Sequence, residues 1–95
     1  MAKERVHLVV HGRVQGVYYR ATAQEKAIGL GLAGWVRNRA DGAVEVVAEG
    51  DRERLDKLIE WCRVGPERAQ VGNVDIDWES YTGEFREFAI KYRER

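Results

Sequence analysis

The pattern of hydrophobic and polar residues predicts five short strands, and in four of them the two kinds of residue alternate. Val6, Leu8 and Val10 mark the first strand, and the others are expected over residues 32–38, 43–49, 74–78 and 88–92. Two further segments, residues 22–30 and 51–62, carry apolar residues at helical spacing. Glycines follow the first of these helices, and Gly65-Pro66 follows the second.

The order of these elements predicts the fold. It is strand, helix, strand, strand, helix, strand, with a short terminal strand, and Asp41-Gly42 joins the second and third strands in a hairpin. We expect an α+β, ferredoxin-like split βαβ sandwich, in which an antiparallel sheet has two helices on one face and a short fifth strand. A length of 95 residues predicts one domain, 1–95.

Charge and cysteine content narrow the function classes. The 16 Lys and Arg residues balance 16 Asp and Glu residues, whereas proteins that bind duplex nucleic acid carry a basic excess. A single cysteine permits no intrachain disulfide and fits a reducing compartment. No signal peptide or membrane-spanning run is visible. We therefore expect a cytoplasmic protein without nucleic-acid or membrane partners, and we take a monomer as the default oligomeric state.

Three sequence patterns that could indicate a binding or catalytic site are better explained by structural roles. The G-x-G-x-x-G pattern at 29–34 leaves a helix and enters a strand, the reverse of a dinucleotide-binding fingerprint. His7 and His11 would lie roughly 13 Å apart on a strand that rises about 3.3 Å per residue, too far for one metal ion with ligands at about 2 Å. Cys62 lies on the apolar stripe of the second helix, so we expect it in the core.

Exposed aromatic residues on a four-stranded sheet would suggest RNA binding through base stacking. Here Trp35, Trp78 and the other aromatic residues are expected mostly at core positions. Asp75 and Asp77 would also repel a phosphate backbone. The sequence thus favours a function other than RNA binding.

The segment HGRVQGVYYR, residues 11–20, holds more than a turn requires. Its glycines allow positive φ and close approach of an anion, and consecutive N–H groups in such a loop can form an anion-binding nest. The following helix adds unpaired N–H groups and the positive end of its dipole. Arg20 supplies a planar charged group suited to phosphate oxygens. The combination indicates a phosphate site.

A second polar position ends the next predicted strand. Asn38 follows Gly34-Trp35-Val36-Arg37 and precedes the hairpin turn. Its amide can donate and accept hydrogen bonds but cannot serve as a general base at neutral pH. Asparagine is also a common turn residue.

Both segments resemble the signatures of one family, the acylphosphatases. Residues 10–20 are similar to its first signature, G-x-V-Q-G-V-x-F-R, with Tyr19 in place of the usual phenylalanine. The added hydroxyl needs a hydrogen-bond partner if it is buried. Residues 34–44, with Gly50, resemble the second signature without departure.

The resemblance implies an enzyme that hydrolyses the carboxyl–phosphate bond of acyl phosphates, with no metal and no cofactor. It assigns Arg20 and Asn38 as catalytic residues, Asn38 by positioning water. It also implies that phosphate, or sulfate in its place, binds in a backbone cradle formed by Gln15, Gly16, Val17, Tyr18, Tyr19 and Arg20.

The expected chemistry is consistent with these residues. A carboxylate leaves as a weak base, with a pKa near about 4, and phosphoryl transfer depends mainly on positioning and charge stabilisation. Two alternatives stay open at the level of sequence. One is a non-catalytic anion- or RNA-binding module on the same fold, and the other is a stand-alone relative of a carbamoyl-phosphate-processing domain.

Overall fold

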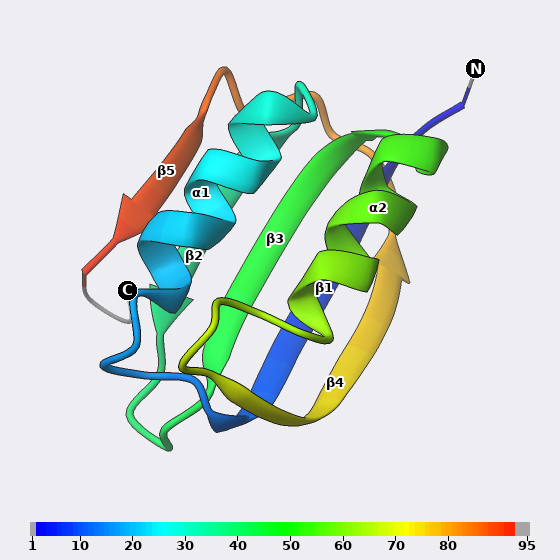
Figure 1. The fold of residues 1–95 in the computed structure, drawn as a ribbon. Helices are drawn as coiled ribbons and strands as arrows, with labels where there is room; N and C mark the ends of the chain where they lie inside the picture. The colour runs from blue at the N-terminus through cyan, green and yellow to red at the C-terminus, as the bar shows by residue number, and fades with distance from the viewer. Residues whose placement is uncertain (1, 93–95) are drawn as a thin grey trace.

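The computed structural model describes residues 2–92, which form five strands and two helices (Figure 1). The strands are β1 (Lys3–Arg13), β2 (Ala33–Asn38), β3 (Val44–Asp51), β4 (Gln70–Glu79) and β5 (Phe88–Lys91). The helices are α1 (Tyr19–Gly29) and α2 (Arg52–Cys62). All seven elements predicted from the sequence are present, in the predicted order.

The strands form one sheet in the order β4-β1-β3-β2-β5. β1 lies between β3 and β4 and is antiparallel to both, and β2 and β3 form the predicted hairpin. Both helices cover the same face of the sheet, as expected (Figure 1). The arrangement is the predicted ferredoxin-like α+β fold.

The direction of β5 corrects the prediction of an antiparallel sheet. β5 pairs with β2 in parallel, so the five-stranded sheet is mixed. The connection from β4 to β5, residues 80–87, stays at one end of the sheet, so β5 runs opposite to β4 (Figure 1). Because β2 also runs opposite to β4, the two neighbours at this edge point the same way.

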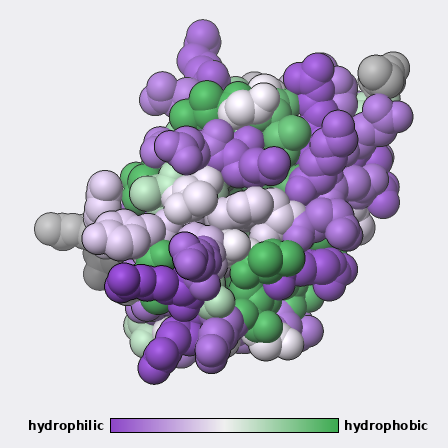
Figure 2. Space-filling view, in the orientation of Figure 1, coloured by the Kyte–Doolittle hydropathy of each residue, from purple (hydrophilic) through white to green (hydrophobic). Residues whose placement is uncertain are grey.

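The core lies between the sheet and the two helices. Leu8 of β1 pairs with Val46 of β3 and with Ile76 of β4, so the alternating apolar positions share the helix-covered face. Leu55 and Leu58 of α2 are fully buried against it. Cys62 is also fully buried, as predicted, and burial raises the pKa of its thiol to about 12. Viewed from the helix side, the surface is mainly hydrophilic, with small separate hydrophobic areas (Figure 2).

The opposite face of the sheet carries charged pairs. Glu49 of β3 is only 3% exposed, and it accepts hydrogen bonds from the N–H groups of Thr82 and Gly83 at 2.9 and 3.0 Å. Arg5 of β1 adds an ion pair to Glu49 at 3.2 Å. The 80–87 connection therefore packs over Glu49 on this outer face, while His7 and Arg37 contact Glu45 further along β3.

The two histidines also belong to this outer face. His7 contacts Glu45 at 2.5 Å, and His11 contacts Asp75 at 2.9 Å. Among residues 2–92, no cluster of three or more His, Cys, Asp or Glu side chains is arranged to hold a metal ion. In the same part of the chain, neither helix has the length and apolar character needed to cross a membrane.

The aromatic residues depart from the expectation that most occupy core positions. Tyr19 is buried and packs against the half-buried Trp61. Tyr18 is 78% exposed, Trp78 lies at the β4 edge, and Trp35 faces outward. On the outer face, the cationic groups of Arg37 and Lys91 lie over the Trp35 ring.

Candidate active site

The predicted phosphate loop lies between the end of β1 and the start of α1. The helix begins at Tyr19, three residues before the predicted start at Thr22. Arg20 therefore lies in the first helical turn, where the first N–H groups have no partner within the helix. The charge of Arg20 and the positive end of the α1 dipole therefore lie together at the start of this helix.

The backbone of this loop turns twice into the left-handed region. Gly16 has φ 75°, and Tyr18 has φ 64° and ψ 23°. A non-glycine residue in this region is disfavoured by roughly 1–2 kcal/mol. Thr22 holds Tyr18 in place, since its N–H and its hydroxyl both donate to the Tyr18 carbonyl oxygen, at 3.1 and 2.7 Å. Backbone strain of this kind is concentrated at functional sites.

The N–H groups of this loop are available to a ligand. Within the described part of the chain, residues 2–92, no acceptor is found for the N–H groups of residues 15–20. Left-handed residues followed by right-handed ones turn successive N–H groups toward a common centre, which is a nest for anions. The loop thus has the backbone geometry that the sequence suggested.

Gly12 has a different role from Gly16. It lies at an irregularity in the β1–β4 pairing, with φ 127°. A Cβ atom there would meet the carbonyl oxygen of Gln70 at 2.2 Å. At Gly16 a Cβ atom would meet nothing within 4 Å. Gly12 therefore serves the close approach of two strands, and only Gly16 belongs to the anion-binding loop.

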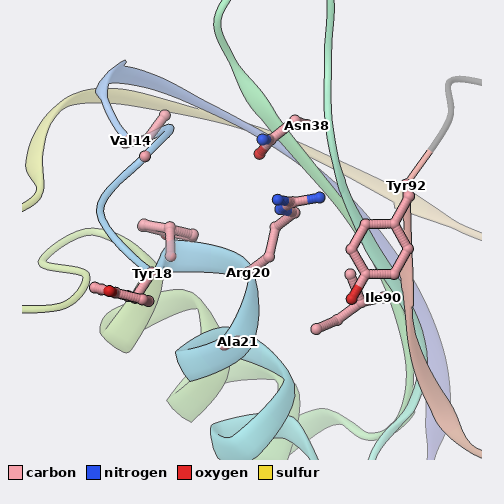
Figure 3. Close-up of a pocket in the computed structure, with 9 residues that line it drawn as sticks. Val14, Tyr18, Arg20, Ala21, Asn38, Ile90 and Tyr92 are labelled. Atoms are coloured by element: carbon pink, nitrogen blue, oxygen red, sulfur yellow. The ribbon is translucent and has the colours of Figure 1, made fainter.

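A pocket of about 340 Å³ opens beside the loop (Figure 3). It joins the loop and the start of α1 to the end of β2 and to the end of β5. Its lining residues are Val14, Gly16, Tyr18, Tyr19, Arg20, Ala21, Asn38, Ile90 and Tyr92. The two predicted catalytic residues, Arg20 and Asn38, therefore share one pocket although they come from different elements.

Asn38 is the last residue of β2 and lies on the helix-covered side of the sheet, paired with Val44. Its Oδ1 atom is buried and has no hydrogen-bond partner among residues 2–92. Leaving a buried acceptor unpaired costs about 1–3 kcal/mol. Such an atom in a pocket wall is suited to a donor that arrives with the ligand.

Arg20 is half-buried and extends from α1 between Asn38 and Tyr92 (Figure 3). Its guanidinium carbon lies 5.2 Å from the centre of the Tyr92 ring, a distance typical of a cation–π contact. In the part of the chain that the structure describes, no carboxylate forms an ion pair with it. The guanidinium donors are thus available for an anion.

The side chains of Gln15 and Val17 do not line the pocket. Gln15 Nε2 instead donates to the carbonyl oxygens of Arg39 and Ala43, at 2.8 and 2.9 Å. These bonds connect the loop to the hairpin that carries Asn38. Val17 packs against the core. The contribution expected from these two residues to an anion is therefore through the backbone.

The contribution expected from Tyr19 is also through its backbone, because its side chain is 1% exposed. Its hydroxyl donates to the carbonyl oxygen of Cys62 at 2.7 Å, so the added hydroxyl has the partner that burial demands. Burial raises the pKa of Tyr19, and the group remains a neutral donor.

Sequence reasoning missed Ile90 and Tyr92. Both follow the alternating pattern of the last strand. That pattern identifies a face but not the neighbouring strand. The parallel pairing of β5 with β2 sets Ile90 beside Val36 and brings the end of β5 to the pocket.

Comparisons with known proteins agree with this geometry. The family model described as acylphosphatase matches residues 6–90. A curated acylphosphatase of Pelotomaculum thermopropionicum is 52% identical over 97% of this chain and 100% of its own length. One of Methylococcus capsulatus is 59% identical over 92% of this chain and 95% of its own. The crystal structure of acylphosphatase from Bacillus subtilis matches with a TM-score of 0.90 at 35% identity, over 94% of this chain and 99% of that one. The matched range includes the loop, Arg20 and Asn38.

Proposed function

Because this chain belongs to the acylphosphatase family and hydrolyses acyl phosphates, we propose specific roles for its two pocket residues. Arg20, with the N–H groups of residues 15–20, binds the phosphoryl group, and Asn38 positions the attacking water. Family membership also replaces the non-catalytic binding module as the interpretation of this fold.

The unpaired Oδ1 of Asn38 carries the proposal. A water molecule that donates one proton to this oxygen satisfies the buried acceptor. Its second proton then points to a phosphate oxygen of the substrate, and a lone pair is directed at phosphorus. Asn38 thereby orients the nucleophile without taking its proton.

The reaction follows from this arrangement. The water oxygen forms a bond to phosphorus as the bond from phosphorus to the acyl oxygen breaks, and the carboxylate leaves with the electron pair. A phosphate oxygen accepts the proton of the water, because neither Arg20 nor Asn38 is a base at neutral pH. The leaving carboxylate needs little acid assistance, since its pKa is near about 4.

Charge stabilisation is the remaining requirement. In phosphoryl transfer, negative charge is spread over the phosphoryl oxygens. The guanidinium of Arg20 and a ring of fixed N–H donors match this charge without reorganisation during the reaction. We therefore propose that turnover requires no metal ion or other cofactor.

Two substitutions test the roles. Hydrolysis of benzoyl phosphate and competitive inhibition by inorganic phosphate are measured for Arg20→Ala and Asn38→Ala, with Arg63→Ala and Asn73→Ala as exposed controls. Arg20→Ala should lose phosphate affinity and turnover together. Asn38→Ala should keep phosphate affinity and lose kcat by about 100-fold or more.

Folded Arg20 or Asn38 variants with near-normal turnover would overturn the assignment. The absence of a metal requirement is tested separately, by measuring the same hydrolysis with and without a chelator. Equal rates are expected, and a rate that falls with chelator and returns with a divalent cation would contradict the proposal.

A further inference from the structure

We propose that Tyr92 and Ile90 form a subsite for the acyl group of the substrate, and that this subsite favours flat, unsaturated acyl groups such as benzoyl. The inference rests on the proposed roles of Arg20 and Asn38. It adds a chemical class of substrate, which the phosphate site alone does not specify.

The wall beside Arg20 is suited to an apolar group. Ala21 from α1 and Ile90 from β5 line the pocket there, and Tyr92 completes the wall at the end of β5. Ile90 is half-buried and packs against the core, so its position is fixed by the sheet. Among the described residues, 2–92, the side chains that form this wall, Ala21, Ile90 and Tyr92, carry no charge.

The in-line geometry of phosphoryl transfer favours a position of the acyl group against this wall. In phosphoryl transfer the attacking and leaving oxygens lie roughly in line through phosphorus. Asn38, which holds the water, lies on one side of the Arg20 guanidinium, and Ile90 lies on the other (Figure 3). The leaving carboxylate lies on the side of phosphorus away from the water, and we place its acyl group against Ile90 and Tyr92, the part of the pocket lining beyond Arg20 from Asn38.

The Tyr92 ring contacts Arg20, and most of the residue is open to solvent. Its ring lies 5.2 Å from the guanidinium carbon of Arg20, yet the residue remains 78% exposed. An aromatic acyl group beside Arg20 can bury part of this exposed ring. Pairing of two aromatic rings contributes about 0.5–1.5 kcal/mol beyond the area that it buries. An acetyl group is too small to gain this contact.

The test compares two substrates within each variant. kcat/KM is measured for benzoyl phosphate and for acetyl phosphate with the unmodified protein, Tyr92→Ala and Tyr92→Phe, and with Tyr81→Ala as an exposed control. Tyr81 is 46% exposed and lies in the 80–87 connection, outside the pocket lining. The difference in intrinsic reactivity between the substrates cancels when this ratio of kcat/KM values is compared between each variant and the unmodified protein.

We expect Tyr92→Ala to lower kcat/KM for benzoyl phosphate by about 10-fold, mainly through KM, while the value for acetyl phosphate changes less than about 2-fold. Inhibition by inorganic phosphate should stay unchanged. Tyr92→Phe should retain the benzoyl preference, because the ring and not the hydroxyl makes the contact.

An unchanged benzoyl-to-acetyl ratio in Tyr92→Ala would overturn the subsite. If both values fell equally, Tyr92 would act only through Arg20, and if neither fell, Tyr92 would not contact the substrate. These outcomes differ from failure of the proposed function, which is read from active Arg20→Ala or Asn38→Ala variants. The benzoyl-to-acetyl ratio of Tyr92→Ala can be read whichever way those variants behave.

Discussion

The hydroxyl of Tyr19 donates a hydrogen bond of 2.7 Å to the carbonyl oxygen of Cys62 and ties the first turn of α1 to the end of α2. In Tyr19→Phe the buried carbonyl loses this donor, and we expect the free energy of unfolding to fall by about 1 kcal/mol. Urea denaturation measures the change, with Tyr81→Phe as an exposed control. Because the loop N–H groups are untouched, kcat should change little. Equal stability of Tyr19→Phe and the unmodified protein would show that the bond contributes nothing.

Gln15 connects the phosphate loop to the hairpin that carries Asn38. In Gln15→Ala both hydrogen bonds are lost, so the loop and Asn38 are held less accurately relative to each other. Small errors in position reduce rate more than binding, and we expect kcat to fall by about 10-fold with little change in inhibition by phosphate. The exposed Gln70→Ala is the control. A fall in phosphate affinity without a fall in kcat would assign Gln15 to binding instead.

Gly16 and Gly42 offer a matched pair of positions. Both have positive φ, 75° and 95°, and at neither would a Cβ atom meet another atom within 4 Å. Replacement by alanine should therefore cost each variant about 1 kcal/mol of unfolding free energy, through backbone strain alone. Only Gly16→Ala should also weaken inhibition by inorganic phosphate, because the proposed anion nest lies in its loop and not in the hairpin turn that holds Gly42. Similar phosphate affinity in the two variants would separate Gly16 from the anion site.

Glu49 should make stability depend on pH. Burial raises the pKa of its carboxyl, but hydrogen bonds from Thr82, Arg5 and Gly83 outweigh burial and lower the pKa below 4.5. A lowered pKa means that the stabilisation is present above the unfolded value of 4.5 and is lost as the pH falls through the folded value. Acid should therefore weaken the contact between β3 and the 80–87 connection.

The variant Glu49→Gln tests this dependence. We expect its unfolding free energy to be about 2 kcal/mol below that of the unmodified protein at pH 7, and the difference to shrink at pH 3. Denaturation at both pH values measures it, with the exposed Glu60→Gln as control. A difference that stays constant between pH 7 and pH 3 would rule out the ionised carboxylate as its source.

Periodicity in the sequence was sufficient for the order of the elements and for the buried faces of β1 and β4, but it did not place Trp35 of β2, which faces outward. Val6, Leu8 and Val10 take the predicted side because an alternating pattern records only inside and outside. It does not record the neighbour, so the parallel pairing of β5 was missed, and Tyr92 with it. That pairing depends on a connection whose course is fixed by contacts such as Thr82 with Glu49.

The position and the backbone character of the loop were predicted, but the start of α1 and the bonds of Gln15 were not. The resemblance to family signatures predicted Arg20 and Asn38 as catalytic residues, and the structure brings them to one pocket. The early start of α1 was hidden because Tyr18, which precedes the helix, is not a usual N-cap residue and adopts a positive φ. The hydrogen bonds from Gln15 to the hairpin could not be predicted either. The sequence shows that Gln15 has an amide donor, but not which carbonyl oxygen accepts from it.

The central place of β1 has a consequence for the growing chain. β1 is made first, yet its two neighbours are β3 and β4, which end at residues 51 and 79. Strand pairings between segments that lie far apart in the sequence form slowly and late in folding. During translation the phosphate loop therefore leaves the ribosome long before the strand that anchors it is paired on both sides. The loop should therefore reach its folded geometry only after β4 has been made.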